Sequence, residues 1–282
     1  MDETFVISIC DDDDDNNNIT DVAPSLDVPR KLINIPDENE ETPIFHAVRL
    51  RNLKALRSLY LSGADLSHTN KLEQSLLHIC DDRIILAQLF KYNISNVNKP
   101  SIDGSTPLHN AIFLSDYDIV ELLLKNKAKT NITDVKKRSP LHLAVMNDCY
   151  EIAELLINSG ADVNAADEEK QTPLHYAVQM NQKNFVDMLL KHKGTVKQTD
   201  IDGYTPLHVA ACKGNKPIIK MLLNRYPKGL HLVTYQGDTP LDLAERFNKM
   251  KEMNLVMQEL GMKSLKVVCD KEKVNTIKGF LN

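Results

Sequence analysis

The sequence has no tryptophan, few glycines and few cysteines, and these shortages narrow the class of protein. Among 282 residues there are ten glycines and five cysteines, and aromatic residues make up 5%. The cysteines are odd in number, widely spaced and never form a CxxC pair, which argues against a disulfide framework and a zinc site. No apolar run approaches the roughly 18 to 20 residues that a membrane-spanning helix needs, so no membrane insertion is expected.

Motifs of catalysis and of targeting are also missing. The sequence contains no Walker A motif, no GxGxxG, no HExxH, no GxSxG and no kinase catalytic loop. We therefore expect a non-enzymatic protein with no cofactor, no metal and no small-molecule substrate. The start, MDETFVISICDDDDD, lacks the basic residues and the long apolar stretch of a secretory signal. Together with the odd cysteine count, this start predicts a cytoplasmic and/or nuclear location.

Charge is distributed unevenly along the chain. The formal net charge is −5, and such a chain is not expected to bind nucleic acid. Residues 1–40 contain twelve acids and two bases, so they carry −10 and the other 242 residues carry +5. Residues 1–35 show little periodic apolar pattern and are expected to form a disordered acidic arm. Two roles remain open for this arm: a solubilising leader, or a pseudo-ligand that lies against the basic body until a partner displaces it.

A tetrad of Thr or Ser, Pro, Leu and His recurs with a period of about 33 residues. Its copies, some of them imperfect, begin at Thr42, Ser75, Thr106, Ser139, Thr172, Thr205 and Thr239, with spacings of 33, 31, 33, 33, 33 and 34 residues. Five close copies in register are too many for chance, and the pattern resembles the ankyrin repeat. The resemblance covers residues 36–262 in about seven units. It implies an ankyrin-repeat solenoid of stacked helix-turn-helix units with β-hairpin-like turns between repeats.

The residue chemistry favours the same all-α unit. Thr or Ser can cap a helix by accepting a hydrogen bond from an unpaired amide, and Pro is tolerated next because the amide it lacks would have had no partner. A second helix is predicted in each unit, as in residues 118–124 and 151–157, whose apolar residues fall on one face at the 3.6-residue period. Neither helix can bury its apolar face alone, so the units must stack into a solenoid.

Five of the nine histidines occupy the tetrad, and their spacing favours a structural role. A metal or catalytic site would need them to converge with carboxylates, cysteines or further histidines, whereas about 33 residues separate each from the next. By resemblance to the ankyrin family, each imidazole should bond its own Thr or Ser hydroxyl and the backbone of the neighbouring loop. The pairs expected to do so include Thr106 and His109, Ser139 and His142, Thr172 and His175, and Thr205 and His208.

The first, second and last repeats are degenerate. Phe45 replaces the tetrad histidine in the first repeat and Asp242 replaces it in the last, which fits terminal repeats with a different outer face. Repeat two is two residues short after His78, which predicts a reduced inter-helix turn and the weakest unit. One extra residue near Tyr226 predicts a local bulge before the last repeat. Residues 263–282 are charged and weakly amphipathic, and are expected to form a short C-terminal capping helix or tail.

Partner binding is expected on the concave face, which by resemblance is lined by the inter-repeat turns and the first helices. Apolar residues at the ends of these helices are too frequent for a face that contacts only water, and exposed apolar patches often mark interaction sites. Arginine and tyrosine often carry binding energy beside such patches. The expected partner-binding residues are Phe113, Leu114, Arg138, Met146, Asn147, Gln171, Gln179, Met180, Tyr204 and Lys213. The alternative is that Phe113 or Leu114 packs under a neighbouring loop.

The leading functional hypothesis is a protein-binding adaptor or regulator of unknown partner. An alternative is a cytoplasmic inhibitor of a transcription factor that resembles the IκB type, which joins an acidic arm to six or seven repeats. The DSGxxS motif that would favour it is missing, since the only serines in residues 1–40 are Ser8 and Ser25. Part of a larger ankyrin-bearing protein is not favoured, because 22 residues follow Leu260. Asn164 resembles the position that an asparaginyl hydroxylase modifies in ankyrin repeats, although a hairpin Asn chosen for its turn conformation is the simpler explanation.

Overall fold

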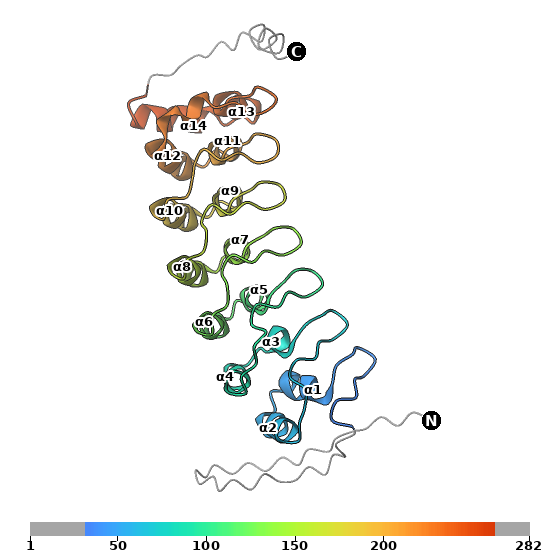
Figure 1. Cartoon of the computed structure of the whole chain (residues 1–282). Helices are drawn as coiled ribbons and strands as arrows, with labels where there is room; N and C mark the ends of the chain where they lie inside the picture. Colours follow the sequence, from blue (N-terminus) through green and yellow to red (C-terminus); the bar gives the residue numbers. More distant parts are fainter. Residues whose placement is uncertain (1–31, 263–282) are drawn as a thin grey trace.

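The computed structural model describes residues 32–262 and shows short helices stacked in two columns (Figure 1). Successive helices alternate between the columns, so each of seven repeats contributes one helix to each, and the described residues contain no β-strand. This arrangement confirms the predicted all-α solenoid. The α-helices are α1 Pro43–Arg49, α2 Leu53–Leu61, α3 Leu76–Ile79, α4 Arg83–Lys91, α5 Pro107–Phe113, α6 Tyr117–Lys125, α7 Pro140–Met146, α8 Tyr150–Asn158, α9 Pro173–Gln179, α10 Lys183–Lys191, α11 Pro206–Lys213, α12 Lys216–Arg225, α13 Pro240–Arg246 and α14 Met250–Glu259, and a 3₁₀-helix, η1, spans Pro227–His231.

Local sequence sets where both helices of a repeat begin. The residue before each first helix has an extended backbone, and proline occupies the first turn in six of the seven repeats. Proline is tolerated there because the first amides of a helix have no partner within it. In four repeats the second helix begins at an Asn or Asp whose side chain accepts a backbone hydrogen bond, which satisfies an otherwise unpaired amide. These capping residues are Asn52, Asp82, Asp116 and Asn215.

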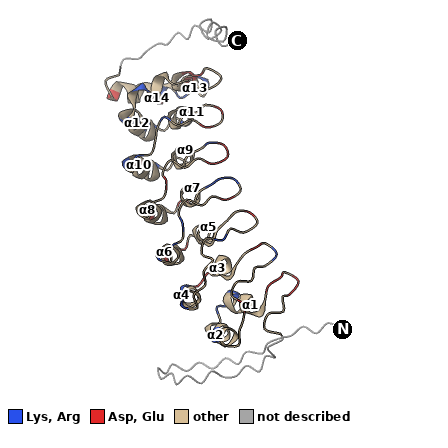
Figure 2. Ribbon diagram, viewed as in Figure 1, with Lys and Arg blue, Asp and Glu red and all other residues tan. Residues whose placement is uncertain are grey.

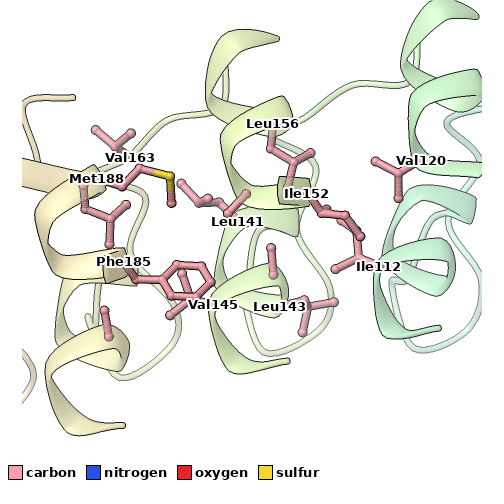
Figure 3. Close-up of a cluster of buried hydrophobic side chains, with 14 of the residues drawn as sticks. Ile112, Val120, Leu141, Leu143, Val145, Ile152, Leu156, Val163, Phe185 and Met188 are labelled. Carbon is pink, nitrogen blue, oxygen red and sulfur yellow. The ribbon is translucent and has the colours of Figure 1, made fainter. Parts of the chain in front are cut away.

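One apolar core runs continuously through the stack. First helices pack on first helices, as α5 does on α7 and α7 on α9, while second helices such as α4 and α6 pack on each other. Each repeat therefore buries its apolar face against its neighbours, and the stability of the stack depends on these contacts between adjacent repeats. Figure 3 shows part of this core, where the labelled side chains are Ile112, Val120, Leu141, Leu143, Val145, Ile152, Leu156, Val163, Phe185 and Met188.

The turns between repeats are hairpins that project from the column of first helices (Figure 1). At each successive tip, one backbone amide donates to a carbonyl of the preceding hairpin over 2.9–3.1 Å, as Val135 does to Asp103. Within the hairpin of repeat four, the Asp134 carboxylate accepts from the amides of Lys136 and Arg138 at 3.0 and 2.8 Å. In four other hairpins a side-chain oxygen accepts from two backbone amides in the same way. These oxygens belong to Asp37, Asn70, Asp167 and Asp200. The hairpins thus form a ribbon along one side of the stack.

Repeat two is shortened in its first helix, so the prediction of a reduced inter-helix turn was wrong. The helix α3 has four residues, whereas α1, α5, α7, α9 and α13 have seven. Residues 80–82 separate α3 from α4, and residues 50–52 separate α1 from α2, so both turns have three residues. The loss falls on the helix because its buried start, with Leu76, Leu77 and His78, keeps its place in the core. The extra residue near Tyr226 is accommodated by η1.

Packing extends upstream of the predicted domain boundary at residue 36. Ile33 is almost completely buried, and the Asn34 side-chain oxygen accepts from the Asp65 amide at 2.9 Å. Residues just before the predicted boundary therefore contact the end of repeat one, which has no upstream repeat to cover it. The rest of the predicted acidic arm, residues 1–31, and the predicted capping helix or tail, residues 263–282, lie outside the described residues.

Candidate protein-binding surface

Each tetrad histidine links its own helix start to the next hairpin. The Nδ1 atom of His142 accepts from the Ser139 amide at 3.1 Å and from the Ser139 hydroxyl at 2.8 Å. Because both donors face Nδ1, the proton lies on Nε2, which donates to the Gln171 carbonyl at 3.1 Å. The other four tetrad histidines make the same contacts with the Thr or Ser of their own tetrad and with the carbonyl of the residue that precedes the next tetrad. These carbonyls belong to Ser105, Arg138, Tyr204 and Asp238, and His208 also contacts the Leu232 carbonyl.

Burial keeps these histidines neutral. Loss of solvation lowers the pKa of every tetrad imidazole below its ordinary value, and in His78 it lowers the pKa to about 4. A neutral ring is also what the geometry requires, since protonated Nδ1 could not accept two hydrogen bonds. The structure therefore brings together the predicted Thr or Ser and His pairs as structural links. Among residues 32–262, no three His, Cys, Asp or Glu side chains are grouped so that they could hold a metal ion.

The terminal repeats replace histidine in two different ways. Phe45 is fully buried and offers no acceptor, so the buried Thr42 hydroxyl has no hydrogen-bond partner among the described residues. Asp242 keeps half of the histidine's role, because one carboxylate oxygen accepts from the Thr239 amide at 2.8 Å and from its hydroxyl at 2.7 Å. A carboxylate has no proton to donate to a following repeat.

The ends of the first helices carry the most exposed apolar side chains of the predicted site. Phe113 is 73% exposed and Leu114 is 57% exposed, so neither packs under a neighbouring loop. Met180 is also exposed. Met146 was predicted to be exposed but is half-buried and packs against the core. Three polar residues of the predicted site, Asn147, Gln179 and Lys213, are exposed at equivalent helix ends.

The predicted binding residues on the hairpins are less exposed to a partner than expected. The Arg138 guanidinium bonds the buried Asp134 carboxylate, with Nε and Nη2 at 2.7 and 2.6 Å from the same oxygen. Gln171 is half-buried, and its carbonyl is already used by His142. The half-buried Tyr204 ring stands edge-on to His208, with centroids 5.9 Å apart. All three side chains are partly buried, so the prediction that these positions are fully exposed was wrong.

Apolar residues are also exposed at several hairpin tips, among them Ile102, Val135, Ile201 and Tyr235. Ile102 is 62% exposed and Val135 is 65% exposed, at equivalent positions of adjacent hairpins. The repeat register predicts that both residues are exposed in the turns, but neither was among the expected partner-binding residues. We name Ile102, Phe113, Leu114 and Val135 together the central patch. Lys136 and Lys137 follow Val135 with exposed side chains. Figure 2 shows basic residues in blue on the hairpin before α7.

Asn164 has a structural role in the described chain. Its side-chain nitrogen donates to the Lys193 carbonyl at 3.3 Å, and its side-chain oxygen accepts from the Thr195 amide at 2.7 Å. Asn34, Asn98 and Asn131 make the same pair of contacts with the following repeat. These contacts account for an asparagine at this position. Hydroxylation of Asn164 stays a prediction.

Comparison with known proteins agrees with the repeat architecture. The family model described as "Ankyrin repeats (3 copies)" matches residues 44–134, 76–167, 116–200, 141–230 and 193–263. An ankyrin repeat protein of Acanthamoeba polyphaga mimivirus is 37% identical over 103 residues, which are 36% of this chain and 14% of the relative. The chain thus spans a small part of that relative's length. Among residues 32–262, no helix has both the length and the apolar character needed to cross a bilayer. Ankyrin repeats generally serve as protein-interaction modules, and this chain belongs to the ankyrin-repeat family.

Proposed function

We propose that the chain is a non-enzymatic, protein-binding adaptor or regulator that binds its partner across the concave face, and that it acts in the cytoplasm and/or nucleus. The observation that carries the proposal is the central patch. Four large apolar side chains are exposed in two adjacent repeats, on hairpin tips and on the end of α5. Isolated apolar side chains are common on protein surfaces, but a group of this size on one side of a stack is typical of an interaction site.

The rigidity of the surface supports the same proposal. Backbone hydrogen bonds between the tips join the hairpins of adjacent repeats. The Asn147 side chain donates to the Ile112 carbonyl at 3.3 Å, which connects the end of α7 to the end of α5. A surface held in this way loses little conformational entropy on binding, so a larger share of the contact energy contributes to affinity. The partner is expected to offer apolar side chains to the central patch.

The test is capture of partners from cell lysate by the full chain, followed by titration of each identified partner in purified form. The variant Leu114→Glu with Met180→Glu places two carboxylates on the concave face and should abolish binding of the partner. A matched control is Leu61→Glu with Ile84→Glu, because these residues are similarly exposed but lie on the second helices α2 and α4. The control should bind the partner as the unmodified chain does.

Circular dichroism of both variants separates loss of binding from loss of fold. Both should keep the helical signal of the unmodified chain, since all four substituted side chains are exposed. If the concave variant folds and still binds every partner, the partner surface lies elsewhere and the proposal fails. If the two double variants lose binding equally, the effect comes from added charge and not from the concave face.

A further inference from the structure

Two kinds of side-chain link recur at the joints between successive repeats. One is the tetrad histidine, which donates to the residue before the next tetrad, as His109 does to the Arg138 carbonyl at 3.4 Å. The other is an asparagine eight residues before a tetrad, such as Asn131, which bonds the Gly160 carbonyl and the Asp162 amide at 3.2 and 2.8 Å. Both links are present at each of the three joints from repeat two to repeat five.

The joint between repeats one and two has neither link within residues 32–262. Phe45 stands in the place of the histidine and cannot donate a hydrogen bond, and the buried Thr42 hydroxyl is left without a partner. Ser67 stands eight residues before the tetrad at Ser75, in the place of the asparagine. Its hydroxyl donates to Asp65 at 2.7 Å, which keeps the side chain within repeat one.

The joints nearer the C-terminus keep the histidine link. Between repeats five and six, Lys197 replaces the asparagine, but His175 still donates to the Tyr204 carbonyl at 3.1 Å. Between repeats six and seven, His208 contacts the Asp238 carbonyl at 3.2 Å. In the part of the chain that the structure describes, only the joint between repeats one and two therefore lacks both links.

The hydrogen bonds that do join repeats one and two lie mainly on the hairpins. Two of the groups involved, the side chains of Asn70 and Glu41, are buried. A hydrogen bond shielded from water is harder to replace than an exposed one, so this edge of the joint is firmly held. The bonds join Lys71 to Asn39, Asn70 to Glu41 and His68 to Glu40, over 3.0, 3.1 and 2.7 Å.

The opposite edge of this joint, where α2 and α4 are neighbours in the column of second helices (Figure 1), is held differently. Tyr60 of α2 stacks on Tyr92, with ring centroids 3.6 Å apart and an angle of 12° between the rings. Stacking is less directional than a hydrogen bond, so it tolerates a small shift of one ring over the other. At the inter-helix turns, Arg51 and Asp81 form an exposed ion pair at 2.8 Å, and exposed pairs contribute little.

We propose that repeat one pivots as a unit about its hairpin, so that α2 moves toward and away from α4 while repeats two to five keep their relative positions. The hairpin bonds form the axis, because they are the firm contacts of this joint. Repeat one keeps its own fold during the motion, since α1 and α2 pack on each other. The pivot changes the curvature of the stack at its N-terminal end, in the manner of a hinge between two rigid parts.

The experiment measures the distance between two nitroxide labels on the full chain by pulsed electron paramagnetic resonance. The native cysteines are first replaced, Cys80 by the alanine that other repeats have at this position and the other four by serine. Labelled cysteines then replace Lys54 and Ile84, the exposed second residues of α2 and α4. The control pair is Asp118 and Glu151, the exposed second residues of α6 and α8. We expect the distance distribution of the first pair to be at least twice as wide as that of the control pair.

Two double variants test whether the links set these widths. Phe45→His with Ser67→Asn supplies both missing links and should narrow the first distribution to the width of the control. His109→Phe with Asn131→Ser removes both links between repeats three and four, and should widen the control distribution at least twofold. Each variant is measured at the helical signal of the unmodified chain. The comparison of the two label pairs without these substitutions stands independently of both variants.

Three results would overturn the proposal. The first is an equal width for the two label pairs. The second is an unchanged width of the first pair in the folded Phe45→His, Ser67→Asn variant, because the missing links would then not be the cause of the motion. The third comes from hydrogen exchange, in which the amides of α1 and α2 should stay protected. Loss of protection throughout both helices would show that repeat one unfolds and does not pivot.

Discussion

Acidification from pH 7 to pH 5 should destabilise this protein through its buried histidines. The five tetrad histidines are buried and neutral, and burial lowers the pKa of each below the ordinary value of 6.5. Below pH 6.5 the unfolded chain therefore binds protons that the folded chain does not. The stability that these residues contribute is complete above pH 6.5, and it is lost as the pH falls toward the folded pKa.

The magnitude follows from His78, whose pKa is lowered to about 4. Each pH unit between 6.5 and 4 costs about 1.4 kcal/mol, so at pH 5 this residue alone removes about 2 kcal/mol of the free energy of unfolding. The other four tetrad histidines act in the same direction. Carboxyl groups whose pKa is held below the ordinary value, such as those of Asp81 and Asp103, titrate below this window.

The assay is urea unfolding followed by circular dichroism at pH 7, 6 and 5, for the unmodified chain and for His78→Asn. Asparagine does not titrate, so the loss between pH 7 and pH 5 should be about 2 kcal/mol smaller in the variant. His192→Gln is the control, because His192 is exposed after α10 and its replacement should keep the full loss. If the unmodified chain and His78→Asn lose stability equally between pH 7 and 5, the tetrad histidines are not the groups that titrate, and the reasoning fails.

Other perturbations probe the tetrad, the short repeat and the core. Thr172→Ala and His175→Ala should each lower the free energy of unfolding by about 1–3 kcal/mol, through loss of a helix cap or of a buried hydrogen bond, and thermal or urea unfolding that shows no change would contradict this. Repeat two should open first in hydrogen exchange because its first helix is the shortest, and protection equal to that of repeat four would argue against it. Leu156→Ala should cost about 2–5 kcal/mol in urea unfolding and Leu155→Ala clearly less, because Leu156 is fully buried and Leu155 is half-buried.

The parts of the structure that follow from short-range chemistry could be predicted from the sequence. The Thr-Pro pair places the start of each first helix, and the contacts of His142 with Ser139 lie within one helical turn. The repetition of this unit then predicts the stacking, because the apolar face of each repeat can be buried only against adjacent repeats.

Burial at the helix ends could not be predicted in the same way. Phe113 and Met146 occupy the same position of their repeats, yet one is exposed and the other half-buried. Register along a helix cannot decide between them, because the outcome depends on how each side chain folds against the adjacent repeat. Leu155 was predicted to lie in the core, but it is half-buried and its neighbour Leu156 is fully buried, because consecutive residues of a helix lie on different faces.

Side-chain hydrogen bonds between repeats and within the hairpins could not be predicted from the sequence either. The bonds of Asn164 join it to Lys193 and Thr195, about 30 residues away, and no local signal separates this role from that of a turn residue. The hydrogen bonds from Arg138 to the Asp134 carboxylate were missed for a related reason, because they form only when the hairpin has folded.

The histidine links also give the stack a direction. Each tetrad ring depends on the hairpin that follows it, because its Nε2 proton needs a carbonyl from the next repeat, as His175 needs that of Tyr204. Removing a repeat from the N-terminal side would leave a carbonyl without its donor, whereas removing one from the C-terminal side would leave a buried N–H without an acceptor, which is the rarer and costlier defect. Asp242 avoids that defect in repeat seven, since it holds the Thr239 cap and has no proton to place. A shortened array that ends at repeat six should therefore fold better when His208 is replaced by aspartate, and shortening from the other end should need no such change.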